Sequence, residues 1–134
     1  MLTVIALIAL ALGALTGLRA LLQPHWIANT LKLQATPDRP GGFAEFRASF
    51  GGIFLFLHLF GIYAVLTQGE FHGAIIAATI SMGWFGAAVG RILSIILDKE
   101  ENGTGGINRI WIVLELVIGS MLAAPMVSLH FPAA

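Results

Sequence analysis

The sequence contains no cysteine and very little charge. Without cysteine there is no disulfide scaffold, no thiolate metal site and no catalytic thiol. Charged residues make up 10% of the 134 residues, whereas a soluble domain has about 25%, so these side chains cannot cover a water-facing surface. Seven basic residues balance seven acidic ones. This balance leaves no electrostatic footprint for a polyanion, and we expect no nucleic-acid partner.

Long apolar stretches make up most of the sequence. Hydrophobic residues make up 57% of the chain, and the mean hydropathy is +0.89. A bilayer core requires roughly 20 apolar residues in a helix, and the alternating pattern of a transmembrane barrel is absent. The first stretch lacks the basic start and cleavage site of a signal peptide, so we expect it to be retained. The sequence predicts an all-α integral membrane four-helix bundle, a single domain over residues 1–134, with helices over residues 2–22, 44–66, 73–97 and 108–129.

The first connection, residues 23–43, is too long for a turn and too apolar for a solvated linker. Apolar residues at roughly helical spacing predict a short helix in the membrane interface over about residues 24–35, with Trp26 at headgroup level. Prolines and glycines in residues 36–42 then break the helix. This segment either seals the bundle or gates a pocket beneath it.

All the basic residues lie in or beside the first and third connections: Arg19, Lys32, Arg39, Arg47, Arg91, Lys99 and Arg109. Basic residues in short loops favour the cytoplasm. We therefore expect both termini outside and the loops over residues 23–43 and 98–107 in the cytoplasm.

Several charges fall inside the predicted helices. At 1.5 Å per residue, Arg91 and Glu115 lie about 10 Å and about 9 Å from the cytoplasmic ends of neighbouring helices, so the sequence predicts a direct contact. Intramembrane charges are functional candidates because they are costly to bury. The candidate ligand-binding cluster consists of Arg47, Arg91, Asp98, Glu115, Glu45 and Arg19.

This cluster has two interpretations. It either holds the helices together as a neutral network or forms the floor of a pocket, open to the cytoplasm, that binds a polar headgroup or small anion. Buried ion pairs are weak evidence for stability, because desolvation can cancel the Coulomb gain. Both interpretations therefore stay open.

Small residues mark positions where helices can approach closely. One stripe contains Gly83, Gly86, Gly90 and Ser94, and a pair, Gly13 and Gly17, lies in the first helix. Doubled glycines next to Arg47 either pack a helix or admit a ligand. The predicted packing or pocket residues are Gly51, Gly52, Gly86, Gly90 and Ser94.

Histidines do not cluster in this sequence. His58 has no second histidine at its depth, which makes a bis-histidine haem improbable and favours a packed histidine inside the bundle. No spacing typical of a metal site, a nucleophile elbow or a phosphate-binding glycine loop is found. We expect no catalytic residue, no metal and no cofactor.

The intramembrane motifs resemble one family. The elements are Arg47 with Gly51-Gly52, Gly90-Arg91 with Ser94 and Asp98, and a lone Glu115 in the last helix. Together they are similar to the domain of unknown function 4345 family, small bacterial membrane proteins with four helices. The resemblance covers nearly the whole chain and implies a bacterial inner membrane, but it implies no activity. Lys99 stands where relatives are expected to carry glycine.

Two functions compete on these residues. The first is a non-catalytic accessory or scaffold protein that packs against a larger membrane complex or a second copy of itself. The alternative is a binder or small carrier of an amphiphilic or anionic ligand, lipid-like or quinone-like, at a cytoplasmic pocket around Arg91 and Glu115. An enzyme is the less favoured reading, and membrane lipids are expected partners of either.

The predicted orientation can be tested directly, because the chain has no native cysteine. Single cysteines introduced as Lys99→Cys and Gly69→Cys should react with an impermeant maleimide from opposite sides of the membrane. Lys99→Cys should react only after the membrane is opened. Labelling of Lys99→Cys in intact cells would reverse the orientation.

Overall fold

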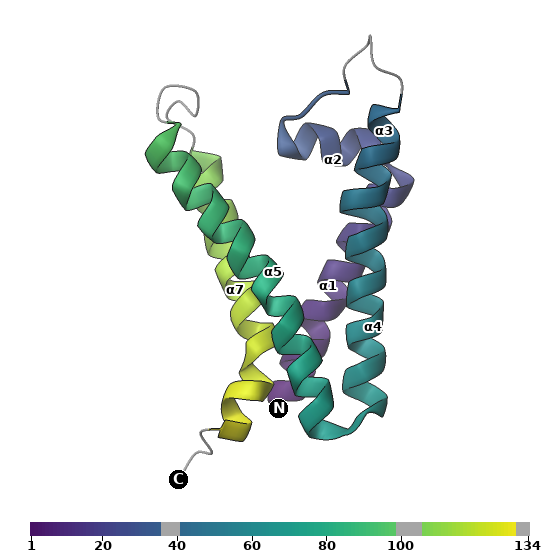
Figure 1. The fold of residues 1–134 in the computed structure, drawn as a ribbon, viewed down its shortest axis with the longest axis vertical. Coiled ribbons are helices and arrows are strands. Elements are labelled where there is room, and N and C mark those ends of the chain that lie inside the picture. The colour runs from purple at the N-terminus through teal and green to yellow at the C-terminus, as the bar shows by residue number, and fades with distance from the viewer. Residues whose placement is uncertain (36–40, 99–105, 131–134) are drawn as a thin grey trace. The chain divides into compact units, whose positions relative to one another are not determined.

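Helices make up most of the structure. The computed structural model describes residues 1–35, 41–98 and 106–130. The elements are α1 (Leu2–Leu22), α2 (Pro24–Leu31), α3 (Gly42–Glu45), the π-helical segment η1 (Phe46–Gly52), α4 (Ile53–Thr67), α5 (Gly69–Leu97) and α7 (Gly106–His130) (Figure 1). Among the described residues, four apolar helical stretches are long enough to cross a membrane: Leu2–Leu22, Gly42–Thr67, Gly69–Leu97 and Asn108–His130. The all-α membrane class is confirmed.

Two boundaries differ from the sequence prediction by more than two residues. The third spanning helix begins at Gly69, four residues before the predicted start, because Gly69 adopts φ +77° and reverses the chain at once. The interfacial helix ends at Leu31 rather than near residue 35. Lys32 takes the left-handed conformation there, and the Leu33 N–H donates to the carbonyl of Ala28, which closes the helix as in a Schellman motif.

The predicted break in the first connection lies partly outside the described residues, since residues 36–40 are not described. The third connection lies outside them over residues 99–105. On the far side of the first gap, Gly41 has φ 104°, and helical structure resumes at Gly42.

Contacts group the chain into two compact units. Unit 1 contains Met1–Ala9 and Ala64–Ala134, and unit 2 contains Leu10–Tyr63. The single-domain organisation stays a prediction.

In unit 2, glycines allow α1 to approach η1 and α4 closely. A Cβ added at Gly17 would lie 2.4 Å from the backbone nitrogen of Leu55, and one added at Gly51 would lie 2.7 Å from the Cα of Leu21. Real Cβ atoms do not approach so closely, so these backbones are nearly in contact. Gly17 and Gly51 thus lie at close approaches of two backbones, and whether Gly51 also admits a ligand stays open.

Helix α2 lies across the direction of α3 and α4 (Figure 1). Its inner face joins a small apolar core made by Ala20, Ile27, Ala28 and Phe46, with Trp26, Leu31, Ala35, Phe43 and Phe50 packed around it. Pro24 starts the helix at a position where its missing N–H costs nothing. The short helix predicted here is present, and its position in the membrane interface stays a prediction.

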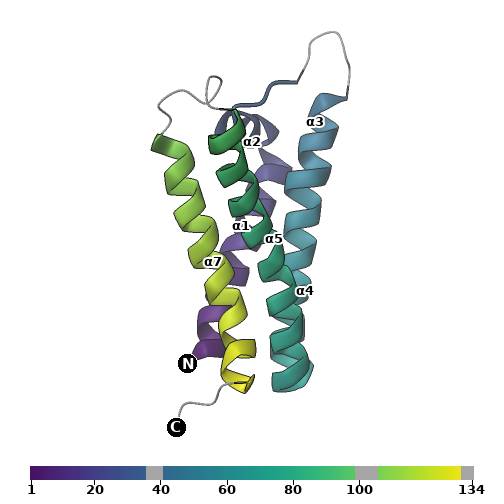
Figure 2. The same ribbon diagram turned by 60° about the vertical axis from the view of Figure 1, so that its left-hand side comes forward.

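In unit 1, α5 and α7 lie side by side in both ribbon views (Figures 1 and 2). The pair is close enough that a Cβ added at Gly119 would lie 2.6 Å from the ring of Phe85. Gly73 similarly faces the Cα of Val65, at 2.8 Å from the added Cβ, where α5 begins against the end of α4.

These distances predict opposite effects for two chemically identical substitutions. Gly17→Ala should lower the free energy of unfolding by about 1–3 kcal/mol, because its methyl group overlaps the backbone of Leu55. Gly86→Ala is the matched control: no heavy atom in the described part of the chain lies within 4 Å of its added Cβ. Alanine there should raise stability by about 0.5–1 kcal/mol through helix propensity. Thermal unfolding in detergent measures both, and equal shifts would contradict the packing.

Candidate functional site

The predicted contact between Arg91 and Glu115 is present in unit 1. Arg91 Nε donates to Glu115 Oε1 at 2.7 Å, joining α5 to α7 in a charge-assisted hydrogen bond. The Glu115 side chain is 5% exposed and that of Arg91 is 28% exposed. The acid is therefore nearly enclosed, whereas the base keeps an open side.

Neither member of this ion pair uses all of its hydrogen-bonding groups. Glu115 Oε2 is buried and has no hydrogen-bond partner within the described residues. The bond to Glu115 uses Arg91 Nε, so the two terminal guanidinium nitrogens make no hydrogen bond to the described residues. A carboxylate and a guanidinium can form two parallel hydrogen bonds. Here only one forms, so Glu115 keeps one acceptor oxygen and Arg91 keeps its terminal N–H donors for another partner.

Trp111 forms one wall of the same site. The guanidinium carbon of Arg91 lies 5.8 Å from the centre of the Trp111 ring, within cation–π range. Trp111 precedes Glu115 by four residues on α7, so both side chains lie on the same helix face. The site therefore combines a cation, a buried carboxylate and an aromatic surface.

Arg47 belongs to unit 2 and makes a different contact. One of its terminal nitrogens donates to the carbonyl of Leu21, in the last turn of α1, where helix carbonyls lack partners. Arg47 sits in η1, whose π-helical turns contain more residues than α-helical turns and redirect the side chains. Such segments are frequent at functional sites.

Arg19 and Glu45 also belong to unit 2. The guanidinium carbon of Arg19 lies 4.2 Å from the centre of the Trp26 ring. Glu45 is exposed and makes no ion pair with the described residues. The six predicted cluster residues therefore divide between the units, and the single cluster stays a prediction.

The remaining candidates lie on α5 in unit 1. Asp98 ends the helix, and its backbone N–H donates to the carbonyl of Ser94. Gly86 and Gly90 are exposed, and added Cβ atoms there meet no heavy atom within 4 Å in the described ranges. Gly52, in unit 2, meets only the carbonyl of Arg47, at 3.6 Å. The packing role of these three glycines stays a prediction.

His58 is a packed histidine inside unit 2, in agreement with the sequence interpretation. His58 is 3% exposed, and its Nδ1 lies 2.6 Å from the carbonyl oxygen of Phe54. Its ring fills the space beside Gly13, where an added Cβ would lie 2.1 Å from the imidazole. Within the described ranges, no three histidine, aspartate or glutamate side chains gather in a way that could hold a metal ion.

Sequence reasoning missed three features of these sites: Trp111, the contact of Arg19 with Trp26, and the carbonyl that Arg47 caps. The spacing of Trp111 and Glu115 was a usable signal, because residues four apart share a helix face. Each of the other two contacts joins α1 to a later helix, on the far side of the helix break at Gln23. Spacing along a single helix therefore cannot predict them.

A comparison with protein-family models decides the family. The model described as "Domain of unknown function (DUF4345)" matches residues 1–124. The chain belongs to this family. The match covers every candidate residue in both units and confirms the family resemblance of the intramembrane motifs. No curated protein and no solved structure matches the chain.

The DUF4345 family name assigns no activity, so function in this DUF4345 protein has to be argued from its site. It has one arrangement of charged and aromatic side chains in each unit: the Arg91–Glu115–Trp111 site in unit 1, and the Arg19–Trp26 and Arg47–Leu21 contacts in unit 2.

A double-mutant cycle on this DUF4345 protein tests the pair. Arg91→Leu and Glu115→Leu should each lower the free energy of unfolding, by up to about 3–5 kcal/mol, because each leaves a charge without its partner. Solvation of the surviving group at the membrane surface reduces that loss. The double variant should recover part of it, as measured by thermal unfolding in detergent. Arg109→Leu removes an exposed arginine and is the matched control. Additive losses would contradict the pair.

Proposed function

We propose that this protein binds the polar head of a neutral amphiphile at the Arg91–Glu115–Trp111 site. One observation carries the proposal: Glu115 Oε2 is buried without a hydrogen-bond partner among the described residues. An unsatisfied buried carboxylate oxygen costs more than an ordinary lost hydrogen bond. A ligand that donates a hydrogen bond to this oxygen removes that cost.

The charge of the site selects the ligand. Arg91 and Glu115 already neutralise each other, so an additional full charge at this depth has no counter-ion within the pair. The complementary head is neutral overall, with a donor for Glu115 Oε2 and an acceptor for the terminal nitrogens of Arg91. Hydroxyl groups and hydroxyl–carbonyl pairs meet both requirements.

Exposed apolar residues on α5 and α7 offer hydrocarbon surface for the tail of such a ligand. Ile92 on α5 and Leu114 on α7 follow and precede the two charged residues in the sequence, and both are exposed. Their apolar surface lies within the helical stretches that are long enough to span a membrane. A bound amphiphile therefore meets polar groups at its head and hydrocarbon at its tail.

The orientation and location belong to the same proposal. The clustering of basic residues around the first and third connections supports a cytoplasmic position for both. The bacterial inner membrane is the location implied by the resemblance to small bacterial membrane proteins. In this orientation the Arg91–Glu115 site is nearer to the cytoplasmic surface.

The accessory or scaffold role is the second candidate. The exposed, glycine-rich face of α5, which includes Gly83, Gly86 and Gly90, supports it, because such faces allow another helix to approach closely. Co-purification in mild detergent, with mass analysis of the particle, tests this role. A particle containing only one copy of this chain would contradict it.

Binding can be measured with three probes that share one hydrocarbon chain: oleyl alcohol, methyl oleate and oleate. Oleyl alcohol both donates and accepts, methyl oleate only accepts, and oleate carries a charge. We expect the alcohol to raise the melting temperature of the purified protein most. Bromination of the oleyl chain should also make it quench Trp111 emission in a Trp26→Phe, Trp84→Phe background.

Glu115→Leu should abolish the preference for the alcohol over the methyl ester, because it removes the accepting oxygen. Arg109→Leu, at an exposed position, should leave it unchanged. Equal responses of the unsubstituted protein to alcohol and ester would overturn the proposal, as would a preference that survives in Glu115→Leu.

A further inference from the structure

We propose that a groove in unit 2 binds the phosphate head of an anionic phospholipid at the membrane interface. The groove lies at the junction of α1, α2 and α3, and its volume is about 490 Å³. Its lining belongs wholly to unit 2, Leu10–Tyr63, whereas Arg91 and Glu115 belong to unit 1.

Unit 2 carries an excess of basic residues, although the chain as a whole is neutral. Residues 10–63 carry four basic residues, Arg19, Lys32, Arg39 and Arg47, against the two acidic residues Asp38 and Glu45. The rest of the chain has the opposite excess, with three basic and five acidic residues. Unit 2 therefore attracts anions even though the formal net charge of the protein is zero.

The walls of the groove divide into polar and apolar surfaces. Arg47, His25 and Gln23 supply hydrogen-bonding groups, and Leu22, Trp26 and Phe43 supply hydrocarbon and aromatic surface. A small anion in water requires only the polar surface. A phospholipid needs both, because its phosphate is joined to a glycerol backbone and acyl chains.

Arg47 is held at the edge of this groove. Its bond to the Leu21 carbonyl occupies one terminal nitrogen, and the described residues offer the remaining donors no partner. A guanidinium presents five N–H donors, so one backbone bond fixes the side chain and leaves donors for a phosphate oxygen. Arg47 is thus both an anchor for the end of α1 and a candidate phosphate ligand.

A second guanidinium lies beside the groove. Arg19 stacks over Trp26, and Trp26 itself lines the groove. Stacking on an aromatic ring leaves the in-plane N–H donors of arginine available for an anion. Arg47 from η1 thus lines the groove itself, and Arg19 from α1 stacks on a tryptophan that lines it.

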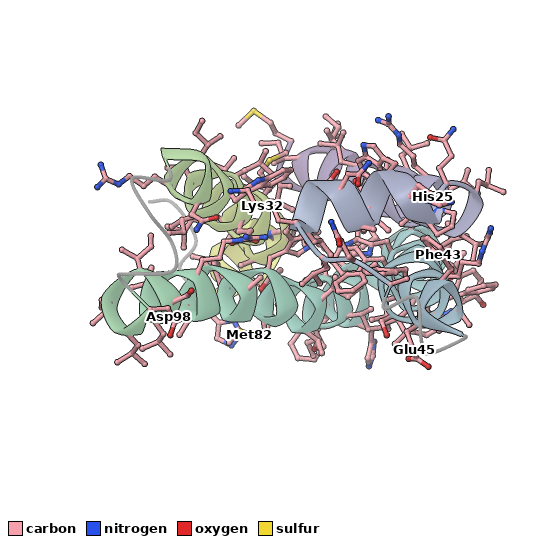
Figure 3. All side chains as sticks on the ribbon, turned by 90° about the horizontal axis from the view of Figure 1, so that it is seen from above. His25, Lys32, Phe43, Glu45, Met82 and Asp98 are labelled. Atoms are coloured by element: carbon pink, nitrogen blue, oxygen red, sulfur yellow. The ribbon has the colours of Figure 1, made fainter. Side chains whose placement is uncertain are left out.

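His25 and Phe43 complete the entrance. Their ring centres are 4.3 Å apart, and Figure 3 shows them together at the beginning of α2, with Lys32 at the other end of the helix and Glu45 beyond Phe43. The acidic Glu45 is thus turned away from the first turn of α2. The tryptophan and basic residues at this helix are typical of a segment at headgroup depth, where phospholipid phosphates lie.

The occupant follows from these observations. Positive charge selects an anionic head over a zwitterionic one, and the apolar walls select a lipid over free phosphate. Basic residues near a membrane surface contribute enough attraction to anionic lipid that losing one reduces binding about fivefold. We therefore expect phosphatidylglycerol to be preferred over phosphatidylcholine with the same acyl chains.

Native mass spectrometry of the purified full chain in detergent measures this preference. Phosphatidylglycerol and phosphatidylcholine are titrated separately, and inorganic phosphate is added in a third arm. The unsubstituted protein should retain phosphatidylglycerol preferentially, and inorganic phosphate should not displace it. Arg47→Gln and Arg19→Gln should each reduce the preference about fivefold.

Arg109→Gln is the matched control, because it removes one exposed arginine from unit 1 and should leave the preference unchanged. Arg19 makes no hydrogen bond to backbone among the described residues, so Arg19→Gln tests the groove even where Arg47→Gln loosens the end of α1. Equal retention of both lipids, displacement by inorganic phosphate, or an equal loss in Arg109→Gln would each overturn the proposal.

Discussion

A carboxylate buried between two apolar helices is the constraint on which the account of unit 1 depends. Glu115 is almost fully enclosed on α7, and Arg91 on α5 supplies the positive charge that makes its ionised form tolerable. The bond uses one oxygen of Glu115 and one nitrogen of Arg91. If Glu115 served only to join the two helices, an oxygen without a partner would add nothing to stability. A binding site, in contrast, requires an oxygen that is available to the ligand.

The two units place their charges in different physical settings. In unit 1 the charge is paired within a helical contact, which favours a neutral ligand with directional hydrogen bonds. In unit 2 one arginine lies at a helix end and the other over an aromatic ring, beside the helix predicted to be interfacial, which favours an anionic head. A composition with equal numbers of acids and bases thus contains two charged arrangements, for which we propose different ligands.

The spanning helices could be predicted because length and hydropathy decide them. The contact of Arg91 with Glu115 could also be predicted, since depth along neighbouring helices is a simple count from the helix ends. The π-helical turns at Phe46–Gly52 could not, because hydropathy does not distinguish a π-helix from an α-helix. Nor could the bond from Arg47 to Leu21, which depends on how a helix end meets another helix in three dimensions. Small residues predicted close approach correctly at Gly17 and Gly51, but spacing alone does not say which face meets a neighbour, and Gly86 is open.

The central claim is that Glu115 Oε2 accepts a hydrogen bond from a bound ligand. An experimentally determined structure of the protein in lipid nanodiscs tests it most directly. The account predicts non-protein density within hydrogen-bonding distance of Glu115 Oε2 and of the terminal nitrogens of Arg91, continuing as a tail along α5 or α7. A structure in which a protein group satisfies Oε2, with no density beside Arg91, would contradict it.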